Sequence, residues 1–522
     1  MLNLPLSDYN SWQLERFSTC GRGGADMTRH LLAIDQGTTG TTALVMDVEG
    51  RTLGRATREF PQHFPQPGWV EHEPDEIWDS VCVAVRGALS AAGLGWESIA
   101  AIGITNQRET TVLWDRATGK PVHRAIVWQD RRTADRCAEL EAQGHGPRVR
   151  ETTGLVLDPY FSGTKVGWLL GHVAGARPRA EKGELAFGTV DSYLIWRLTG
   201  GKTHVTDVTN ASRTLLMNLR TLAWDDGMCS LFGVPRALLP TIVPSAGSIA
   251  KTSGAGDIPD GVPICGIAGD QQAALFGQAC FNEGDVKCTY GTGAFVLIHT
   301  GARPVMSRFG LLTTVGWKVG NELVYALEGS SFIAGAAVQW LRDGLGIIQT
   351  AADVEPLARK VTSSEGVTFV PALAGLGAPY WDAGARGLIA GITRGTTAAH
   401  LARATLEAIA HQVADLVGAM ADDLGRPVRR MRVDGGAAAN DLLMELQANL
   451  SDLVVERPAE LESTARGAAM LAGLGVGLFA TPAQTAGMSK ATNVFRATID
   501  AGARDKMRGA WGDAVRRARS PS

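Results

Sequence analysis

The first patterned stretch of the chain is a pair of apolar runs joined by a polar tip. Residues 31–47 read LLAIDQGTTGTTALVMD, which is apolar, then rich in glycine and threonine, then apolar again. This pattern predicts a β-hairpin. Residues 52–60 predict a third strand. Residues 73–93 predict a helix, because apolar side chains recur at helical spacing between leading acids and a final glycine.

A buried strand comes next, and the order of elements then repeats. Residues 99–109, IAAIGITNQRE, are apolar before they end abruptly in polar residues. Residues 286–301, VKCTYGTGAFVLIHTG, give a second hairpin pattern with a Gly-Thr-Gly tip, followed again by strand and helix patterns. Hairpin, strand, helix and strand occur twice, so we predict a duplicated α/β domain with its boundary between residues 276 and 283.

The predicted division has three parts. An N-terminal extension without a fold covers residues 1–26, a first domain covers residues 27–278, and a second domain covers residues 279–522. The extension contains acids and lacks the sustained apolar segment of a secretory signal. Two such domains would face each other across an interdomain cleft, with both hairpin tips on it.

The two hairpin tips carry the parts of a phosphate-binding site. A hairpin turn needs only two or so residues, whereas the first tip runs from Asp35 to Thr42 and offers glycines, N–H groups, hydroxyls and one acid. A threonine-rich turn in water is the alternative for either tip alone. Two equivalent tips predict a clamp for a polyphosphate. Thr38, Thr39 and Thr292 would supply hydroxyls, and Asp35 would hold Mg²⁺ through water, because Mg²⁺ keeps most of its water shell.

A candidate general base follows another buried strand. In CGIAGDQQAALFG, Asp270 leads an alanine-rich helix after a buried apolar run. Asp270 could serve as a helix N-cap, a common role for aspartate. The functional alternative makes it the base that accepts a proton from an alcohol. Gln271 and Gln272 are unnecessary for a cap and suit a wall that binds a polyol.

A second group of candidates lies around the strand that ends in NQRE. Arg108 and Glu109 stand at a strand end, where α/β proteins place their sites. A surface ion pair is the alternative for them. Trp128 of IVWQ and Tyr160 of DPYF could cover the carbon face of a small polyol, although either aromatic alone is more often a core residue.

The stretch VDGGAAAN is a candidate adenosine site. Gly435 and Gly436 end a strand and begin a helix, with Asn440 one turn further on. Glycine lets a flat base lie against the backbone, and asparagine can hydrogen-bond the edge of a base. A tight strand-to-helix turn without a ligand is the alternative.

Composition limits the classes of protein that fit. The chain has 522 residues, 45% hydrophobic and 20% charged, with a formal net charge of −3, which argues against a general nucleic-acid binder. Seven cysteines without a C-x-x-C pair predict reduced thiols in the cytoplasm. Residues 467–488 are uncharged but broken by glycine and proline, so a buried helix is predicted and no membrane span.

The motifs together resemble the FGGY family of carbohydrate kinases, in the actin/Hsp70/sugar-kinase superfamily. The resemblance runs from about residue 31 to about residue 511. It rests on DQGTT, GITNQRETT, IVWQ, DPYFSGTK, VTDVTNASRT, GIAGDQQAALFGQ, YGTG, LLTT, YALEG, PALAGLGAPYWD and VDGGAAAN. The resemblance implies an α/β fold of two duplicated ribonuclease-H-like domains. It is strongest for the family members that phosphorylate glycerol.

The resemblance also implies an activity and its partners. The activity is ATP-dependent phosphorylation of glycerol to sn-glycerol 3-phosphate in glycerol catabolism, with ATP and Mg²⁺ as cofactors. The implied partners are glycerol and ATP, without nucleic acid, in a cytoplasmic homo-oligomer that is a dimer or tetramer.

Residue roles are carried over position by position from the family. The residues that would hold the glycerol hydroxyls are Arg108, Glu109, Tyr160, Asp270 and Gln271, with Asp270 as catalytic base. Trp128 and Phe295 would line its carbon side. The residues on the nucleotide side would be Thr38, Thr39, Gly40, Thr292, Gly335, Gln339, Gly436 and Asn440.

The sequence departs from the family pattern at two places. The family usually reads DQGTTS-x-R, so Gly40 replaces a serine and Thr42 replaces an arginine on the phosphate side. This departure bears on nucleotide affinity and not on the reaction. Residues 250–263 lack the glycine-rich run and the arginine with which some members bind a sugar-bisphosphate regulator, so we do not expect that regulation.

Two alternative functions remain open at this point. The first is a sister FGGY kinase that phosphorylates a ketopentose, which a substrate panel would separate. The second is an ATP-driven chaperone or filament protein of the same fold. Glycerol-independent ATPase activity together with peptide or polymer binding would favour that second alternative.

Overall fold

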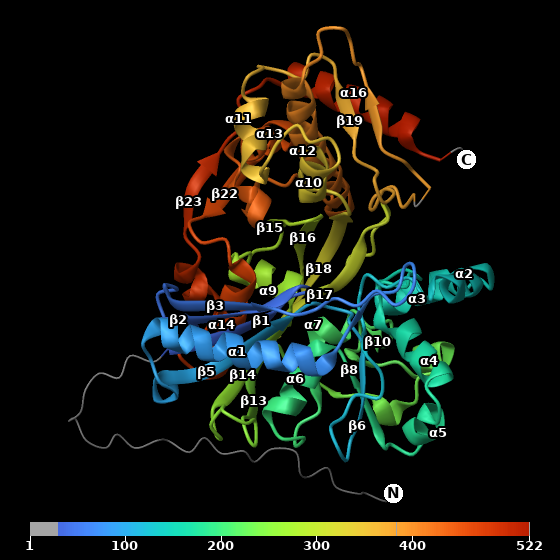
Figure 1. Cartoon of the computed structure of the whole chain (residues 1–522), viewed down its shortest axis with the longest axis vertical. Coiled ribbons are helices and arrows are strands. Elements are labelled where there is room, and N and C mark those ends of the chain that lie inside the picture. The colour runs from blue at the N-terminus through green and yellow to red at the C-terminus, as the bar shows by residue number, and fades with distance from the viewer. Residues whose placement is uncertain (1–29, 383, 521–522) are drawn as a thin grey trace, which may run out of the picture.

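The structure is a computed structural model that describes residues 30–382 and 384–520 (Figure 1). The predicted extension at residues 1–26 lies outside the described residues. Two bodies are stacked along the long axis in Figure 1. We call the body around β1 (His30–Gln36), β5 (Ile99–Asn106) and β14 (Pro263–Gly269) the first lobe. The body around β15 (Val286–Tyr290) and β21 (Arg430–Asp434) is the second lobe.

The predicted opening hairpin and its followers form as expected. β1 pairs antiparallel with β2 (Gly40–Met46), which pairs with β3 (Thr52–Glu59). α1 (Pro74–Ala92) ends at Gly93, whose φ of 65° is the left-handed conformation that glycine adopts without strain. β1 and β14 both pair parallel with β5, so the carboxyl ends of these three strands meet at one edge of the sheet.

A long insertion between β5 and β14 completes the first lobe. It contains small two-stranded sheets and helices that Figure 1 shows beside and below the main sheet. With the small strand before β5 and the helix after β14, these elements are β4 (Glu71–His72), η1 (Trp96–Ser98), β6 (Val112–Asp115), β7 (Ala125–Ile126), α2 (Ala134–Ala142), α3 (Gly146–Thr153), α4 (Ser162–His172), α5 (Ala176–Glu181), β8 (Leu185–Gly188), α6 (Val190–Leu198), β9 (Val205–Asp207), α7 (Val208–Ala211), β10 (Met217–Asn218), β11 (Ala223–Trp224), α8 (Asp226–Phe232), η2 (Arg236–Leu238), β12 (Thr241–Val243), β13 (Ala246–Lys251) and α9 (Asp270–Gly277).

The second lobe repeats the hairpin plan. β15 and β16 (Ala294–Gly301) form the second hairpin, β16 pairs with β18 (Glu322–Ser331), and β15 pairs parallel with β21. The remaining elements are β17 (Leu312–Val319), α10 (Gly335–Asp343), η3 (Ala351–Asp353), α11 (Val354–Ala358), β19 (Thr368–Val370), β20 (Leu388–Ala390), α12 (Ala398–Leu424), η4 (Gly436–Ala439), α13 (Asp441–Ser451), β22 (Val454–Pro458), α14 (Ser463–Gly475), α15 (Pro482–Thr485), η5 (Ala486–Met488), β23 (Ala491–Phe495) and α16 (Ala501–Ala518).

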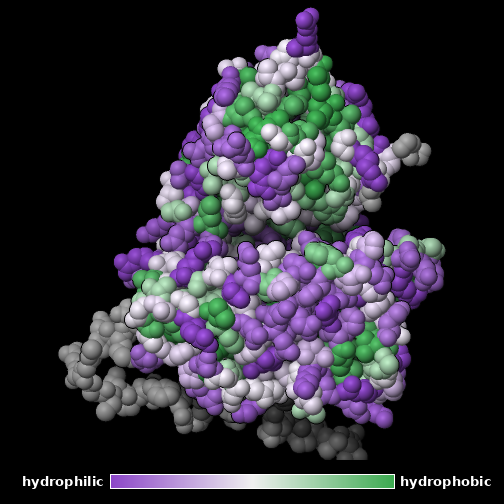
Figure 2. All heavy atoms as spheres, in the orientation of Figure 1, coloured by the Kyte–Doolittle hydropathy of each residue, from purple (hydrophilic) through white to green (hydrophobic). Residues whose placement is uncertain are grey.

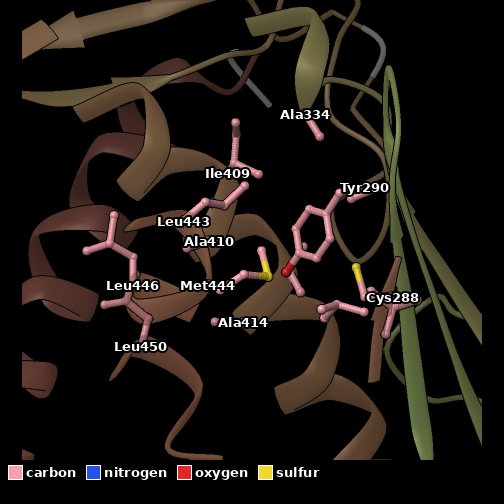
Figure 3. Packing of buried hydrophobic residues seen from close by; sticks show 14 of the residues in the cluster. Cys288, Tyr290, Ala334, Ile409, Ala410, Ala414, Leu443, Met444, Leu446 and Leu450 are labelled. Atoms are coloured by element: carbon pink, nitrogen blue, oxygen red, sulfur yellow. The ribbon is translucent and has the colours of Figure 1, made fainter. Parts of the chain in front are cut away.

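One sheet runs through both lobes. Its thirteen strands follow the order β23-β22-β21-β15-β16-β18-β17-β13-β14-β5-β1-β2-β3. The core of the second lobe lies between this sheet and α12 and α13, where Tyr290, Ile409 and Met444 pack together (Figure 3). Tyr290 donates its buried hydroxyl to Gln447 at 2.7 Å, so even this apolar core leaves no phenol unsatisfied.

α14 leaves the second lobe and packs against α9, β1, β5 and β14 of the first lobe. Glycines on both sides make this approach possible. A Cβ on Gly103 would lie 2.1 Å from the carbonyl oxygen of Ala468, and one on Gly467 would lie 1.8 Å from that of Ala273. α14 is buried for most of its length, which confirms the predicted buried helix for residues 467–475. The rest of the predicted segment, residues 476–488, contains the short α15 and η5. In the described ranges, helices of sufficient length and apolarity to cross a membrane are absent.

The predicted division at residues 278 and 279 stays a prediction. The first crossing of the chain between the lobes falls between α9 and β15, close to that position. α14 crosses back in the opposite direction, and β23 then returns to pair with β22. A single boundary at residues 278 and 279 therefore does not assign every later element to the lobe against which it packs.

Candidate active site

The carboxyl ends of β5 and β14 bring Arg108 and Asp270 together. The Nε of Arg108 lies 3.0 Å from Oδ1 of Asp270, which also accepts the backbone N–H of Gln271 at 2.7 Å. Gly269, and not Asp270, is the N-cap of α9, so the N-cap alternative for Asp270 is wrong. Oδ2 of Asp270 has no hydrogen-bond partner within the described part of the chain, and the side chain is 31% exposed.

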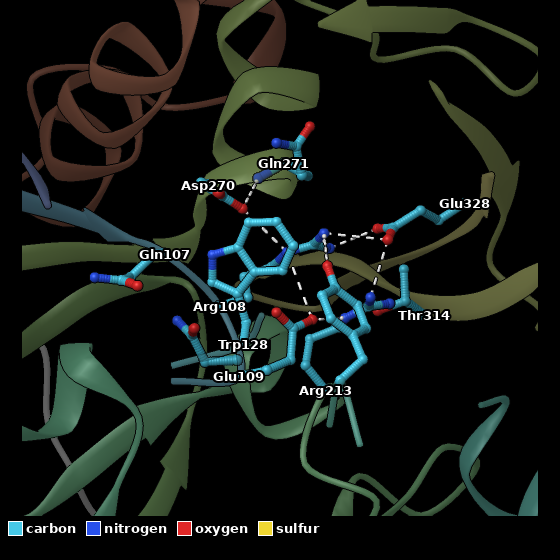
Figure 4. A network of polar contacts seen from close by, with 12 residues as sticks. Gln107, Arg108, Glu109, Trp128, Arg213, Asp270, Gln271, Thr314 and Glu328 are labelled. Atoms are coloured by element: carbon cyan, nitrogen blue, oxygen red, sulfur yellow. Dashed lines mark hydrogen bonds and ion pairs between the residues drawn. The ribbon is translucent and has the colours of Figure 1, made fainter. Parts of the chain in front are cut away.

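Arg108 lies at the centre of a buried polar network (Figure 4). Its guanidinium donates to Glu328 at 2.5 and 3.1 Å, to Gln272 at 3.2 Å and to the hydroxyl of Tyr160 at 3.3 Å. Together with Asp270, these contacts use all five of its N–H groups. The surface-pair alternative is therefore wrong, because Arg108 and Glu109 are only 2% and 1% exposed.

Glu109 is held in an unusual backbone conformation. Its φ is 62°, a region that few residues other than glycine adopt, and such strain tends to gather at functional sites. Its carbonyl accepts from Ser162 and its carboxylate accepts from Arg213 at 2.6 Å. Burial raises the pKa of Glu109, and Arg108 and Arg213 work against that rise.

Arg213 and Glu328 are site residues that the sequence reasoning did not single out. Arg213 donates to Glu328 at 2.9 Å, so two arginines and two glutamates form a closed buried ring with no net charge. The two arginines hold the pKa of Glu328 down at about 2 despite its burial. An acid within the apolar strand YALEG and an arginine in NASRT were the available signals.

Two aromatic side chains connect this network to the first hairpin tip. The indole N–H of Trp128 donates to the hydroxyl of Thr38 at 2.9 Å. The Trp128 and Tyr160 rings meet edge to face, with centroids 5.6 Å apart. Neither ring is a plain core residue, because Trp128 is half-buried between the tip and the network and Tyr160 contacts Arg108. The predicted acceptor wall thus lies directly beside the predicted phosphate tip.

The first tip turns its carbonyls away from the ligand side. The carbonyl of Thr38 accepts from Gln62, and that of Gly37 accepts from Gln36 and Gln107. Buried His72 accepts from Gln107 and donates to Gln62, which braces both of them. Gly37 donates its N–H to the carbonyl of Gly40, and the Thr38 hydroxyl accepts from Trp128. The N–H groups of Thr38 and Thr39 and the hydroxyl of Thr39 have no partner among the described residues, and such donors suit a phosphate cradle.

Gly40 and Thr39 complete that tip. A Cβ on Gly40 would lie 2.9 Å from the carbonyl oxygen of Arg58, so β3 approaches the tip more closely than a side chain there would allow. Thr39 is exposed at the tip, and its carbonyl accepts from Phe60.

Asp35 faces an acidic environment without a protein cation of its own. Burial and then repulsion from Glu462 and Asp270 raise the pKa of Asp35 well above its ordinary value. No hydrogen bond or ion pair of its carboxylate is found within residues 30–382 and 384–520. Groups of three or more His, Cys, Asp or Glu that could hold a metal by themselves are also absent from those residues.

The second tip is flanked by glycines from two other elements. Gly335 at the start of α10 packs on it, since a Cβ there would lie 2.6 Å from the carbonyl of Gly291. Gly435, with φ of 83°, packs equally closely on Tyr290, and Gly436 faces open space. Thr292 at the tip is exposed. The predicted nucleotide residues therefore gather around one end of β15.

The outer nucleotide candidates lie further from this tip. Gln339 stands one helical turn after Gly335 on α10 and is exposed. Asn440 caps α13, where its side-chain oxygen accepts from Leu443 at 2.9 Å, and its amide nitrogen has no partner among the described residues. The ligand-free alternative, a tight strand-to-helix turn, thus accounts for the side-chain oxygen of Asn440, which caps the helix. It does not account for the side-chain nitrogen.

Phe295 lies on the acceptor side of the second-lobe sheet. It pairs with Thr289 on one side and Ser330 on the other. Directly paired side chains share a face of the sheet, and so do side chains two residues apart on one strand. Phe295 therefore shares the face of Lys287, two residues before Thr289, and of Glu328, two residues before Ser330. Both of these residues contact the first lobe. In the space-filling view a recess separates the two lobes (Figure 2).

Comparisons with known proteins agree with this geometry. The model of the FGGY family of carbohydrate kinases, N-terminal domain, matches residues 30–277, and that of the C-terminal domain matches residues 286–476. A glycerol kinase of Alkalilimnicola ehrlichii is 59% identical over 448 residues, 86% of this chain and 90% of the relative. One of Myxococcus xanthus is 56% identical over 492 residues, 94% and 99% of the two chains.

A solved structure gives the same result for the fold. The crystal structure of Plasmodium falciparum glycerol kinase with ADP has a TM-score of 0.88 and 36% sequence identity, and the match covers 95% of this chain and 99% of that one. Matches to both family domains and relatives above 50% identity along nearly the whole chain lead to one conclusion. The chain belongs to the FGGY family of carbohydrate kinases.

Proposed function

We propose that the chain is an ATP:glycerol 3-phosphotransferase, which converts glycerol and ATP to sn-glycerol 3-phosphate and ADP in glycerol catabolism. The observation that carries this proposal is the hydrogen bond from Trp128 to Thr38. It joins a polyol-sized wall of charged and aromatic side chains to a phosphate tip. Phosphoryl transfer needs this proximity of acceptor and phosphate.

The role proposed for Asp270 is that of the base. Oδ1 is anchored by Arg108 and the backbone of Gln271, while Oδ2 is available to accept the proton of the attacking hydroxyl. Burial raises the pKa of Asp270, and Arg108 and Lys287 oppose that rise. The carboxylate is thereby held in place as a proton acceptor while part of it stays open to the acceptor side.

The proposed site also requires charge stabilisation at the phosphates. The first tip supplies N–H groups with Thr38 and Thr39, and the second tip supplies Thr292, toward the oxygens of a transferring phosphoryl group. Asp35 fits a role in holding Mg²⁺, because its carboxylate lies among like charges that a cation would offset. A bound Mg²⁺ would neutralise charge on the phosphates, and without a three-ligand protein cluster it would keep water and phosphate ligands.

Glycerol is favoured over a ketopentose by sequence identity. Glycerol kinases from several bacteria are 52–59% identical to the chain, whereas solved gluconate and xylulose kinases at 22–23% identity share the fold alone. A substrate panel of glycerol, xylulose, ribulose and gluconate separates these possibilities. We also propose a cytoplasmic homo-oligomer, a dimer or tetramer, which light scattering of the purified protein would test.

A coupled assay of ADP release is the direct test of function. ADP should form rapidly with glycerol, ATP and Mg²⁺ present, and at least a hundredfold more slowly when glycerol is left out. Mass spectrometry should identify glycerol 3-phosphate as the product. Glycerol-independent turnover at the full rate would contradict the proposal and favour an ATPase of the same fold.

A further inference from the structure

A buried lysine of the second lobe reaches the acceptor wall of the first. Lys287 on β15 is 0% exposed, and its ammonium donates to the side-chain oxygen of Gln271 and to Thr289. Ion pairs of Lys287 with a carboxylate do not occur in the part of the chain that the structure describes. Burial lowers the pKa of Lys287, and the charges of Asp434 and Asp270 oppose that fall. Burying an amine without a direct carboxylate contact is costly, so its placement here calls for a function.

The contact fixes the orientation of the Gln271 amide. An ammonium only donates hydrogen bonds, so the amide atom that faces it must be the oxygen. The nitrogen of Gln271 then points away from the lysine, and it has no partner among the described residues. Gln272 offers a contrast, because its oxygen accepts from Arg108 and its nitrogen donates to Thr314 and Val315.

Gln271 is therefore the glutamine of this pair with N–H groups left for a ligand. It is 8% exposed and follows Asp270 directly at the start of α9, where the two side chains extend in different directions in Figure 4. A buried amide that offers only N–H groups selects a ligand atom that can accept, such as a hydroxyl oxygen.

We propose that Lys287 is a positioning residue that locks the Gln271 amide with its N–H groups toward the acceptor, so that the site demands a hydroxyl oxygen beside the phosphorylated one. The inference rests on the proposed function and adds a determinant of specificity to it. β15 leads into the second phosphate tip at Thr292. The contact of Lys287 with Gln271 therefore makes acceptor recognition depend on the placement of the second lobe.

The test compares Lys287→Met with Lys287→Gln. Methionine fills similar space without a donor, whereas glutamine can still donate an N–H to the Gln271 oxygen without carrying a charge. The loss of one hydrogen bond predicts a roughly 3- to 10-fold higher KM for glycerol in Lys287→Met, with a smaller change in KM for ATP. Lys287→Gln should recover most of this loss.

Diol substrates provide the readout that a merely structural role would not change. We compare kcat/KM for glycerol with kcat/KM for 1,2-propanediol and 1,3-propanediol, which each lack one hydroxyl. In Lys287→Met the preference for glycerol over 1,3-propanediol, which lacks the hydroxyl beside the phosphorylated one, should shrink by roughly 3- to 10-fold, because a freed amide no longer requires that oxygen. Lys251→Met, on the exposed end of β13, is the matched control and should keep the wild-type ratios.

Two results would contradict the proposed role of Lys287 in orienting the Gln271 amide. One is an unchanged preference among the three acceptors in folded Lys287→Met, or in Lys287→Gln if the methionine variant does not fold. The other is a crystal structure of Lys287→Met in which the Gln271 side chain keeps its position and the orientation of its amide. The crystal structure is informative whichever acceptor the enzyme uses, whereas failure of the wild type to phosphorylate glycerol would count against the proposed function alone.

Discussion

Arg108 and Asp270 are joined by a single ion pair of 3.0 Å that engages only one carboxylate oxygen. The arginine orients the carboxylate, and the second oxygen stays open to the acceptor side. The same arginine has no N–H group left, since Glu328, Gln272 and Tyr160 take the others. A polyol hydroxyl that binds Arg108 must therefore share or displace one of these contacts, and the 3.3 Å contact to Tyr160 is the longest.

Replacement of Asp270 by asparagine should lower kcat and leave glycerol binding largely intact. Asparagine keeps an oxygen for Arg108 but cannot take a proton. General bases contribute about 10²–10⁴-fold, and the loose transition state of phosphoryl transfer places the loss in the lower half of that range. Steady-state kinetics with glycerol titration measure both effects.

Asp226→Asn is the matched control for this substitution, because the Asp226 side chain is 86% exposed and lies in α8. It should turn over at the wild-type rate. Near-normal turnover in a folded Asp270→Asn protein would move the base elsewhere.

Replacement of Glu328 by glutamine should cost both stability and acceptor affinity. The substitution removes the carboxylate that Arg108 and Arg213 share, so the ring of two arginines and two glutamates gains a net positive charge. Glu109 is then the only carboxylate left to Arg213 among the described residues, while Arg108 also keeps Asp270. Breaking a buried ion pair typically costs about 3–5 kcal/mol. Thermal unfolding should show a clearly lower Tm, and KM for glycerol should rise more than KM for ATP.

Glu322→Gln, at the exposed start of the same strand, should leave both quantities unchanged. An unchanged Tm in Glu328→Gln would mean that Glu328 does not carry the charge balance of the ring.

Replacement of Thr42 by arginine should tighten nucleotide binding. Thr42 is the direct cross-strand partner of Asp35, so the two side chains share a face, and Thr42 contacts Thr57 at 3.0 Å. An arginine at position 42 can extend along that face toward a phosphate. A hydrogen bond to a charged group contributes roughly 1.5–3 kcal/mol, less where solvent has access. Kd for ATP and ADP should fall by about 3- to 10-fold.

Calorimetric titration at two salt concentrations checks this prediction, and the gain should shrink as salt rises. Thr118→Arg adds the same charge on an exposed loop and should give no gain. If Thr42→Arg binds no more tightly, the arginine side chain has turned toward Glu462, which already binds Arg55.

The stability of the protein should fall as pH rises toward neutrality because of Asp191. Asp191 is fully buried and accepts from the hydroxyls of Thr189 and Thr206, and burial raises its pKa to about 7. A carboxyl with a raised folded pKa stabilises the fold below its unfolded pKa near 4. That contribution is lost as pH rises through about 7, and its full size is about 4 kcal/mol.

Asp191→Asn mimics the neutral carboxyl and should remove this pH dependence. Tm of the variant should approach that of the wild type near pH 4 and exceed it increasingly up to pH 7, with no further divergence above. Scanning calorimetry from pH 4.5 to 8.5 measures the two curves, and parallel curves would show that Asp191 is not the group responsible.

The local pattern of apolar and polar residues was sufficient to predict the helices and strands that carry the candidate site. The two hairpins and α1 follow from apolar periodicity and end signals within each segment, so neighbouring residues alone predicted them. The role of Arg108 as a buried network centre could not be predicted in this way. Its partner Glu328 is 220 residues away, and the need to neutralise a buried charge does not appear in local periodicity.

The return of α14 to the first lobe was likewise outside the reach of sequence reasoning. The burial of the helix was predictable because residues 467–488 lack charge. The partner against which it packs is set by glycines such as Gly103 and Gly467, which are far apart in sequence and meet only in the fold. Phe295 and Lys287 show the same limit, because strand register and not sequence distance gives them a common face.

The places where the backbone passes from one lobe to the other limit how the lobes can move relative to each other. The polypeptide passes between the lobes after α9, before α14 and after η5, so three strands of backbone span the boundary. Three crossings restrict the relative motion of the lobes more than a single one would. After each opening and closing motion the two phosphate tips would then return to the same spacing. Cleavage of the backbone at any one crossing would make that spacing less well defined before it unfolded either lobe.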